Sequence, residues 1–296
     1  MPSETRPLRL MAILAHPDDE SLGLGGALAR YAAEGVEVTV VTATRGERGR
    51  FRGERQGPLH PGPEGLARIR EAELRSATRV LGVRESIVLG YPDGALAEAD
   101  PLEATSRIAA HVRTVRPDVV LTFPPDGAYG HPDHIAISQL ASAAVVAAAD
   151  PRAAGQGADS EPHAVSKLYY FAWPASTWDA YQSAFKRLVS VVDGVERQAM
   201  PWPEWAITTV IDTRAHWETA WKAVSCHESQ IASYQRLKAL SPDQHAALWG
   251  RQSFYRAFST VNGGRARETD LFEGLRSRDG GSLPGVGIHH GERHDT

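Results

Sequence analysis

The sequence predicts an α/β protein built on a Rossmann-like, mostly parallel sheet with helices on both faces. Continuous apolar runs rich in β-branched residues are typical of parallel strands buried on both sides. The segments between these runs carry apolar residues at helical spacing, and polar residues gather directly after two of the runs. Because open α/β sheets bind ligands outside the carboxyl ends of their strands, we expect the active site at that edge.

Strands and helices alternate through the first half of the chain. The apolar run Leu10–Ala15 predicts the first strand, and Gly35 suits the C-cap of the helix that follows it. A loop over residues 45–65, punctuated by glycine and proline, comes after the carboxyl end of the second strand and is therefore expected to border the site. The predicted order is strand 10–15, helix 21–34, strand 36–44, helix 66–81, strand 87–89, helix 106–116, strand 118–123 and helix 134–149.

The second half of the chain carries a weaker pattern. Trp217 and Trp221 lie four positions apart on a predicted helix, which favours a place in the core. Trp202 and Trp205 lie among prolines and could line an entrance, although ordinary loop packing is the simpler interpretation. The other predicted elements are strands 167–172 and 206–212, a shorter strand candidate at 188–192, and a polar surface loop at 153–161.

The length suits a single large domain. The 296 residues, of which 42% are hydrophobic, are enough to bury a sizeable core. We expect one domain over residues 1–273 and a solvated tail over residues 274–296. The tail contains three histidines to which we assign no function, His289, His290 and His294.

Charge and hydropathy argue against several classes of protein. The formal net charge is −4 and no basic block is present, so nothing favours binding to nucleic acid or to a membrane surface. No apolar stretch is long enough to span a bilayer, and the first residues lack the apolar core of a signal peptide. The single cysteine, Cys226, excludes an internal disulfide and fits a reducing cytoplasm. We expect a cytoplasmic protein with a small-molecule partner, and leave a homo-oligomer open.

A dinucleotide site is the first alternative that the βαβ pattern suggests. Gly23, Gly25 and Gly26 lie inside the predicted helix rather than in the turn before it. Three acidic residues at that turn would repel a pyrophosphate, and no acid ends the second strand to bind a ribose hydroxyl. The sequence therefore argues against a nucleotide cofactor.

Two clusters of histidine and aspartate indicate a metallohydrolase instead. His16-Pro17-Asp18-Asp19-Glu20 follows the first strand, and His131-Pro132-Asp133-His134 follows the strand at 118–123. His16 and Asp19 lie three positions apart in a strand-to-helix turn, so both can reach one divalent metal. Imidazole and carboxylate are ligands of catalytic zinc, which keeps one position open for water. Asp18, next to a ligand but pointing elsewhere, would be available to act on that water.

These two motifs together resemble the PIG-L/LmbE-like zinc N-deacetylases, over a stretch from about Leu8 to Gln230. That family removes acetyl groups from N-acetylglucosaminyl substrates, including the sugar–inositol precursor of mycothiol. The resemblance implies that His16, Asp19 and His134 hold Zn²⁺, although Fe²⁺ or another divalent metal could take its place. It also implies that Asp18 is the general base, which takes a proton from the attacking water and delivers it to the leaving amine.

The same resemblance assigns further roles to residues of the two motifs. His131 matches a histidine beside the developing oxyanion, Asp133 would hold His131 in the required tautomer, and Tyr129 matches a mobile tyrosine that reaches the oxyanion. Glu20 would support the helix start and a metal ligand.

Outside the motifs, Arg70 and Asp93 match residues that bind the substrate. Each has an ordinary alternative, because Arg70 could form a solvated pair with Glu73 and Asp93 could cap a turn. His227 matches a late histidine–glutamine segment of the family, and a capped helix end is its structural alternative.

Two other functions stay open at this stage. A zinc amidase of thiol–sugar conjugates, or of another small amide, would have the same metal centre. A non-catalytic metal- or sugar-binding module is the second alternative, and Asp18 argues against it because binding alone needs no base beside the metal.

Overall fold

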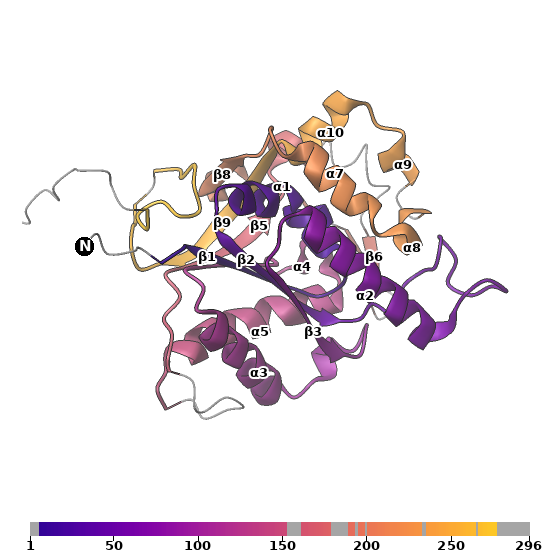
Figure 1. Ribbon diagram of the computed structural model, residues 1–296, viewed down its shortest axis with the longest axis horizontal. Coiled ribbons are helices and arrows are strands. Elements are labelled where there is room, and N and C mark those ends of the chain that lie inside the picture. The colour runs from indigo at the N-terminus through magenta and orange to yellow at the C-terminus, as the bar shows by residue number, and fades with distance from the viewer. Residues whose placement is uncertain are drawn as a thin grey trace, which may run out of the picture.

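A seven-stranded sheet forms the centre of the molecule (Figure 1). The computed structural model describes residues 6–152, 161–178, 189–192, 195–198, 200–232, 235–264 and 266–276. The strand order is β3-β2-β1-β4-β5-β9-β8. The bounds are β1 (Arg9–Leu14), β2 (Glu37–Thr44), β3 (Glu85–Tyr91), β4 (Val119–Thr122), β5 (Lys167–Ala172), β8 (Thr209–Asp212) and β9 (Arg251–Ser259).

The predicted fold class is confirmed. Strands β3, β2, β1, β4 and β5 are mutually parallel, and β9 runs antiparallel to both β5 and β8. The chain leaves β1 towards β2 and β3 on one side and returns to β4 and β5 on the other. The order therefore reverses between β1 and β4, and in open α/β sheets this switch point is where ligands bind.

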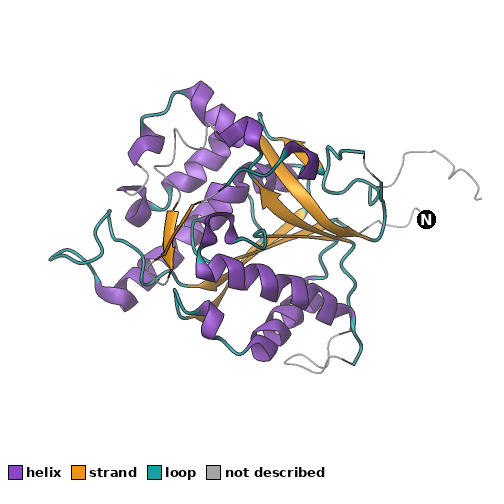
Figure 2. Ribbon diagram, turned by 180° about the vertical axis from the view of Figure 1, so that it is seen from behind, coloured by secondary structure: helices purple, strands orange, loops and turns teal. Residues whose placement is uncertain are grey.

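Helices cover both faces of the sheet (Figure 2). Helices α3 and α5 pack together on one face, and α1, α2 and α7 pack on the other (Figure 1). The helices and 3₁₀ turns are α1 (Asp19–Ala33), α2 (Gly62–Val80), η1 (Leu96–Glu98), α3 (Pro101–Val115), α4 (Gly127–Gly130), α5 (Pro132–Ala149), η2 (Ala175–Thr177), η3 (Glu204–Ala206), α7 (Trp217–Ser225), α8 (Glu228–Ile231), α9 (Gln235–Lys238) and α10 (Pro242–Trp249). No described helix combines the length and the apolar character needed to cross a membrane.

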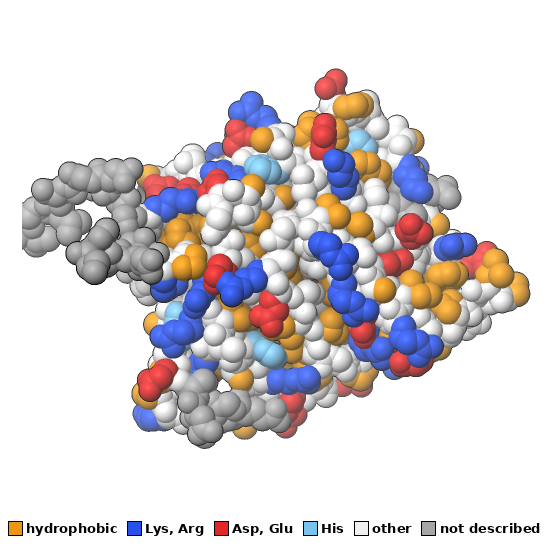
Figure 3. Space-filling view, viewed as in Figure 1, with side chains coloured by type: hydrophobic (Ala, Val, Ile, Leu, Met, Phe, Trp, Pro, Cys, Tyr) orange, Lys and Arg blue, Asp and Glu red, His pale blue; other side chains and the backbone are white. Residues whose placement is uncertain are grey.

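The most apolar predicted segments are the most buried. All residues of Leu10–Ala15 have no exposed surface, which explains why this run can lie at the centre of the sheet. Helix α1 turns Leu24, Leu28 and Tyr31 to the same core, at the helical spacing seen in the sequence. On the face shown in Figure 3, basic and acidic side chains are interspersed.

Several elements of the second half differ from the prediction. The sequence gives no prediction for β9, which lies between β5 and β8 and closes that side of the sheet. The strand candidate at 188–192 corresponds to β6 (Val189–Val192), but it pairs only with β7 (Val195–Gln198) in a separate two-stranded sheet. The segment predicted as strand 206–212 starts as the 3₁₀ turn η3 and becomes strand β8 only from Thr209.

Trp217 and Trp221 are partly buried rather than fully enclosed. They pack with α10 in a small second cluster around Trp249. Most of the predicted tail, residues 277–296, lies outside the described residues together with its histidines, as does residue range 153–160 of the predicted surface loop. The domain bounds stay a prediction.

Candidate metal centre and active site

The turn between β1 and α1 carries the first polar cluster. His16, Asp18, Asp19 and Glu20 are 0–9% exposed, so four ionisable side chains are buried in one turn. Asp18 precedes the helix with a φ of 119°, a left-handed conformation that non-glycine residues adopt only at a cost of about 1–3 kcal/mol. Such strain persists where the surrounding structure holds the residue, and it is found most often at functional sites.

The second cluster follows β4, the neighbour of β1 across the switch point. His131 is the N-cap of α5, and His134 lies in the first turn of that helix with its ring stacked on Phe123 at 3.9 Å between centroids. The ring centroids of His16 and His134 are 5.1 Å apart. The sheet therefore brings together two segments separated by more than a hundred residues, as the sequence predicts.

Hydrogen bonds show which nitrogen of each ring is held by an outer partner and which faces the other histidine. His16 Nε2 lies 3.1 Å from Asp133 Oδ2 and 3.2 Å from Asp93 Oδ1, so this nitrogen carries the proton. His134 Nδ1 donates to the Gly127 carbonyl at 3.2 Å. The two remaining nitrogens, His16 Nδ1 and His134 Nε2, face each other at 3.1 Å. At this distance a proton on His16 Nδ1 is shared with His134 Nε2, and a metal ion held by both nitrogens would replace that proton. Outer carboxylates on the far nitrogen are typical of metal-binding histidines.

Asp19 completes a donor set of the size that zinc requires. Its carboxylate oxygens lie 3.5 Å from His134 Nε2 and 3.6 Å from His16 Nδ1. Ligand atoms about 2.1 Å from a tetrahedral ion are about 3.4 Å from each other, so the three side chains fit one ion. Two other groups of close donor atoms occur among the described residues, His16 with the half-buried His131 and His134, and His16 with Asp93 and Asp133. The two nitrogens that face each other and the Asp19 carboxylate favour the set with Asp19.

The electrostatics of the cluster suit a cation. Burial opposes charge on His16, yet hydrogen bonds to Asp133, Asp19 and Asp93 outweigh it and raise the pKa of His16 well above its usual value. These surroundings favour a positive charge at His16, either a second proton on Nδ1 or a bound cation in its place. Burial lowers the pKa of His134 to about 3, so its ring is neutral and able to act as a ligand. Burial acts to raise the pKa of the Asp19 carboxyl, but His134 and His16 overcome this and hold that pKa far below its ordinary range.

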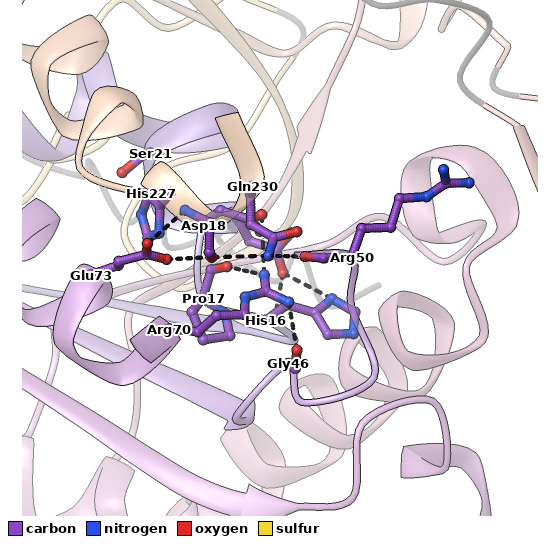
Figure 4. A network of polar contacts seen from close by, with 12 residues as sticks. His16, Pro17, Asp18, Ser21, Gly46, Arg50, Arg70, Glu73, His227 and Gln230 are labelled. Carbon is purple, nitrogen blue, oxygen red and sulfur yellow. Dashed lines mark hydrogen bonds and ion pairs between the residues drawn. The ribbon is translucent and has the colours of Figure 1, made fainter. Parts of the chain in front are cut away.

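Asp18 lies beside the donor set without belonging to it. Its Oδ2 accepts a hydrogen bond from the Arg70 guanidinium at 3.1 Å (Figure 4). The pKa of Asp18 is raised to about 6, mainly by burial. The Arg70 guanidinium acts to lower this pKa, and the neighbouring Asp19 carboxylate acts to raise it. A carboxylate with a pKa close to neutrality is suited to take up and release a proton.

The contacts of Asp133 differ from those that the sequence predicts. The carboxylate of Asp133 accepts hydrogen bonds from the backbone of Gly94 and Leu96 and lies against His16, so it positions His16 rather than His131. The backbone N–H of Asp133 donates to His131 Nδ1 at 3.2 Å, which places the proton of a neutral ring on Nε2. Burial and the neighbouring His16 lower the pKa of His131, which favours that neutral form over the protonated one.

Tyr129 packs edge-on against His131 and His134, with ring centroids 6.1 and 5.1 Å away. Burial raises the pKa of Tyr129 far above its usual value, with Asp19 and Asp18 adding to the effect, so its hydroxyl stays protonated.

The two predicted substrate residues also lie at the site. Arg70 is 4% exposed and donates to the carbonyls of Gly46, at 2.9 Å, and Pro17, which excludes the solvated pair with Glu73 (Figure 4). Glu73 instead accepts from the backbone and hydroxyl of Ser229. Asp93 is 6% exposed, and its Oδ2 accepts from the Arg48 backbone at 2.8 Å.

Comparison with known proteins identifies the family to which the chain belongs. Residues 11–145 match the profile of the family PIG-L, described as GlcNAc-PI de-N-acetylase. The chain is 36% identical to the 1D-myo-inositol 2-acetamido-2-deoxy-alpha-D-glucopyranoside deacetylase of Rhodococcus jostii strain RHA1, covering 90% of this chain and 98% of that protein. It is 34% identical to the enzyme of the same name from Kineococcus radiotolerans, covering 91% of this chain and 84% of that protein. The chain belongs to the PIG-L family.

A solved structure shows that the family fold extends over most of the chain. The conserved protein TT1542 from Thermus thermophilus matches with a TM-score of 0.61 and 28% identity, covering 86% of this chain and 97% of that one. The predicted resemblance to the PIG-L/LmbE-like deacetylases is thus confirmed, and so is the N-deacetylase activity that membership implies.

The PIG-L site lies in a cavity of about 390 Å³. Several lining residues have no distinct signal in the sequence. Phe171 and Trp173 come from the end of β5 and the residues after it, and Arg48 and Arg55 from the loop after β2. Gln230, from the histidine–glutamine segment, lines the cavity from α8. The cavity lining contains Trp173 in place of Trp202 and Trp205. Trp202 packs on Tyr255 with 5.5 Å between ring centroids, and Trp205 is 86% exposed.

His227, from a distant part of the chain, contacts the cluster that follows β1. Its Nε2 lies 2.8 Å from Glu20 Oε1, and Glu20 Oε2 accepts from the Asp18 backbone at 2.9 Å. Burial alone would lower the pKa of His227, but the Glu20 carboxylate outweighs it and raises this pKa above its usual value. The side chain of His227 makes no cap hydrogen bond to α8, so its role is the contact with Glu20 and not the capping of that helix.

Proposed function

We propose that this protein is a zinc-dependent hydrolase that removes the acetyl group from an N-acetylglucosaminyl conjugate, with N-acetylglucosaminyl-inositol as the first substrate to test. The observation that carries the proposal is the pair of facing nitrogens on His16 and His134, 3.1 Å apart, with the Asp19 carboxylate beside them. Asp18, whose pKa is raised to about 6 by burial, adds a base next to that donor set. The names of the two relatives support the choice of substrate.

His16, Asp19 and His134 would hold the zinc ion. When bound, zinc lowers the pKa of a water to about 7 and polarises the acetyl carbonyl; Fe²⁺ or another divalent metal would fit the same ligands. Asp18 takes a proton from the water as its oxygen bonds to the acetyl carbon. The same carboxyl group then gives the proton to the nitrogen as the C–N bond breaks, which yields acetate and a free amine.

His131 and Tyr129 would stabilise the charge that develops on the carbonyl oxygen. The Asp133 backbone leaves the His131 proton on Nε2, and the raised pKa of Tyr129 keeps its hydroxyl a donor. Two neutral donors at a developing oxyanion contribute most where water is excluded, and both side chains line the cavity.

Arg70 and Asp93 would contact the sugar. Asp93 has acceptor capacity left on both oxygens, which suits a hydroxyl group. Arg70 is mainly a positioning residue, because its guanidinium joins the Asp18 carboxylate to the loop after β2 through Gly46. The substrate is a small molecule, and the single cysteine favours a reducing cytoplasm as the place of reaction.

The decisive assay measures release of free amine by the zinc-loaded protein. The substrates are N-acetylglucosaminyl-inositol, N-acetylglucosamine and, for the amidase alternative, a cysteinyl amide of glucosaminyl-inositol. We expect amine release from the first, and its loss in Asp18→Asn. Hydrolysis of the cysteinyl amide alone would make the protein an amidase, and absence of turnover on all three with zinc bound would support a binding module.

A further inference from the structure

The cavity has two side walls of opposite character. In the strand order β3-β2-β1-β4-β5, the candidate metal ligands follow β1 and β4 and form the floor of the cavity. Arg48 and Asp93 line the cavity from the segments after β2 and β3, on one side of this floor. Phe123, Phe171 and Trp173 line it from the ends of β4 and β5, on the other side. We call these three residues the aromatic wall.

The aromatic wall is a continuous row of rings that starts at a candidate metal ligand. The Phe123 ring stacks on His134 at 3.9 Å between centroids. The Phe171 ring lies 4.8 Å from that of Phe123, and the Trp173 ring lies 6.0 Å from that of Phe171. Phe123 and Phe171 are buried, whereas Trp173 is half-buried. The row therefore leads from the floor to a tryptophan that the protein covers only in part.

Neighbouring residues hold Trp173 in place. Its carbonyl accepts a hydrogen bond from the Trp202 N–H at 2.7 Å, and the Ala175 N–H donates to the Trp202 carbonyl at 3.1 Å. The Trp173 ring also packs on Trp178, with 6.4 Å between centroids. A side chain that is already fixed loses little conformational freedom when a ligand packs on it. Trp173 is therefore a preformed contact surface at the end of the aromatic wall.

A neutral sugar conjugate can use both walls. A six-membered ring with mostly equatorial hydroxyls has C–H groups on its two faces and hydroxyls along its edge. Aromatic side chains remove such apolar faces from water, while Asp93 accepts from a hydroxyl at the edge. The 6.0 Å between the rings of Phe171 and Trp173 is similar to the spacing of two six-membered rings joined by one oxygen.

We propose that Trp173 binds the second ring of a neutral two-ring conjugate through the apolar face of that ring, and so gives the enzyme a preference for such conjugates over simple N-acetylglucosaminides. This inference rests on the proposed function, because the acetamide must first reach the floor. The sugar ring then lies beside Phe171 and the ring joined to it lies beside Trp173, in the order of the aromatic wall. Trp173 is thus a specificity-determining residue that takes no part in the chemistry.

Three probes that share one N-acetylated sugar test the preference. They are methyl N-acetyl-α-glucosaminide, cyclohexyl N-acetyl-α-glucosaminide and N-acetylglucosaminyl-inositol. The cyclohexyl ring has no hydroxyl groups, so its advantage over methyl measures apolar contact alone. We expect kcat/KM of the zinc-loaded enzyme to be about fivefold higher for each two-ring probe than for the methyl glycoside. The gain should lie mainly in KM, because the second ring is bound alike in the ground and transition states. Equal kcat/KM for the methyl and cyclohexyl glycosides overturns the inference.

Variants assign the effect to one side chain. Trp173→Leu should bring the cyclohexyl-to-methyl ratio of kcat/KM close to one, whereas Trp173→Phe, which keeps a smaller aromatic ring, should lower it to an intermediate value. Trp205→Leu is the matched control and should keep the wild-type ratio, because Trp205 is 86% exposed and lies outside the cavity lining. The ratio compares two substrates on the same protein, so a loss of folded or zinc-loaded enzyme cancels. An unchanged ratio in Trp173→Leu, or in Trp173→Phe where the leucine variant does not fold, overturns the inference.

A binding experiment separates this inference from the proposed function. Calorimetry on zinc-loaded Asp18→Asn measures Kd for the same three probes without turnover. Tighter binding of the two-ring probes that is lost in Asp18→Asn/Trp173→Leu supports the role of Trp173 even if wild type deacetylates none of them, an outcome that would defeat the proposed function alone. Equal Kd values for all three probes overturn the role of Trp173 even if deacetylation proceeds.

Discussion

The floor of the cavity and its rim are built in opposite ways. On the floor, His16, Asp19 and His134 are at most 9% exposed, and each is held by a further contact from the backbone or from an outer carboxylate. At the rim, Arg48 and Arg55 are exposed and carried by a long loop. The comparison indicates that the sheet holds the chemical groups of the floor in place, whereas the loop presents exposed side chains at the mouth of the cavity.

The largest effect is expected from removing a metal ligand on the floor. Asp19→Ala should lose zinc, and with it essentially all turnover, because its carboxylate also accepts from the His16 backbone at 2.7 Å and so positions a second ligand. Metal content by atomic emission and amine release are the measurements. Zinc retained at one equivalent per chain would show that His131 or another group, not Asp19, completes the donor set.

A smaller effect is expected from the neighbouring position. Asp18→Asn should keep zinc and lower kcat by about 10²–10⁴-fold, the usual loss on removal of a general base. The Asn side chain keeps the size of Asp18 and its contact with Arg70, so folding should be preserved. If Asp18→Asn loses as much zinc as Asp19→Ala, the division between base and ligand is wrong.

The raised pKa of Asp18 predicts how kcat/KM depends on pH. The pKa of Asp18 is raised to about 6 by burial, so the base form is populated above that pH and lost below it. A divalent cation nearby would lower this pKa further. We expect kcat/KM to fall about tenfold per unit on the acid side, with a midpoint at or below about pH 6. A midpoint above pH 7, or a midpoint that is unchanged in Asp18→Asn, would show that another group causes the loss of activity at low pH.

Asp93, between floor and rim, should give the smallest effect. Asp93→Asn should keep zinc and lower kcat/KM by about tenfold, since it weakens one charge-assisted hydrogen bond to the sugar. Asp100→Asn, at the exposed N-cap of α3, is a matched control that should leave kcat/KM unchanged. Zinc loss in Asp93→Asn would instead show that its contact with His16 Nε2, at 3.2 Å, is its main role.

The floor could be predicted from the sequence because two local signals determine it. The run Leu10–Ala15 must be buried, and a histidine and acids directly after it must therefore lie at a strand end. The same reasoning places His134 after β4, and a parallel sheet brings the two ends to one edge. The family resemblance adds the role of each residue, which the strand pattern alone does not give.

The remaining features depend on contacts that no local pattern encodes. Glu20 and His227 pair across 207 positions, and β9 is a strand because β5 and β8 flank it, not because its residues alternate. The carboxylate of Asp133 contacts His16 because the turn at Gly94 and Leu96 holds it there. The spatial neighbours of each loop arginine determine whether its side chain faces the cavity. The sequence alone therefore shows that the segment is basic, but not which of its arginines line the cavity.

Anomalous diffraction at the zinc edge, on crystals of the zinc-loaded protein, would locate the bound ion among its candidate ligands. We expect one strong peak about 2.0–2.1 Å from both His16 Nδ1 and His134 Nε2, with an Asp19 oxygen as the third protein ligand. A peak on the other side of the His16 ring, at Nε2 between Asp93 and Asp133, would contradict it. So would a peak coordinated by His131 in place of Asp19.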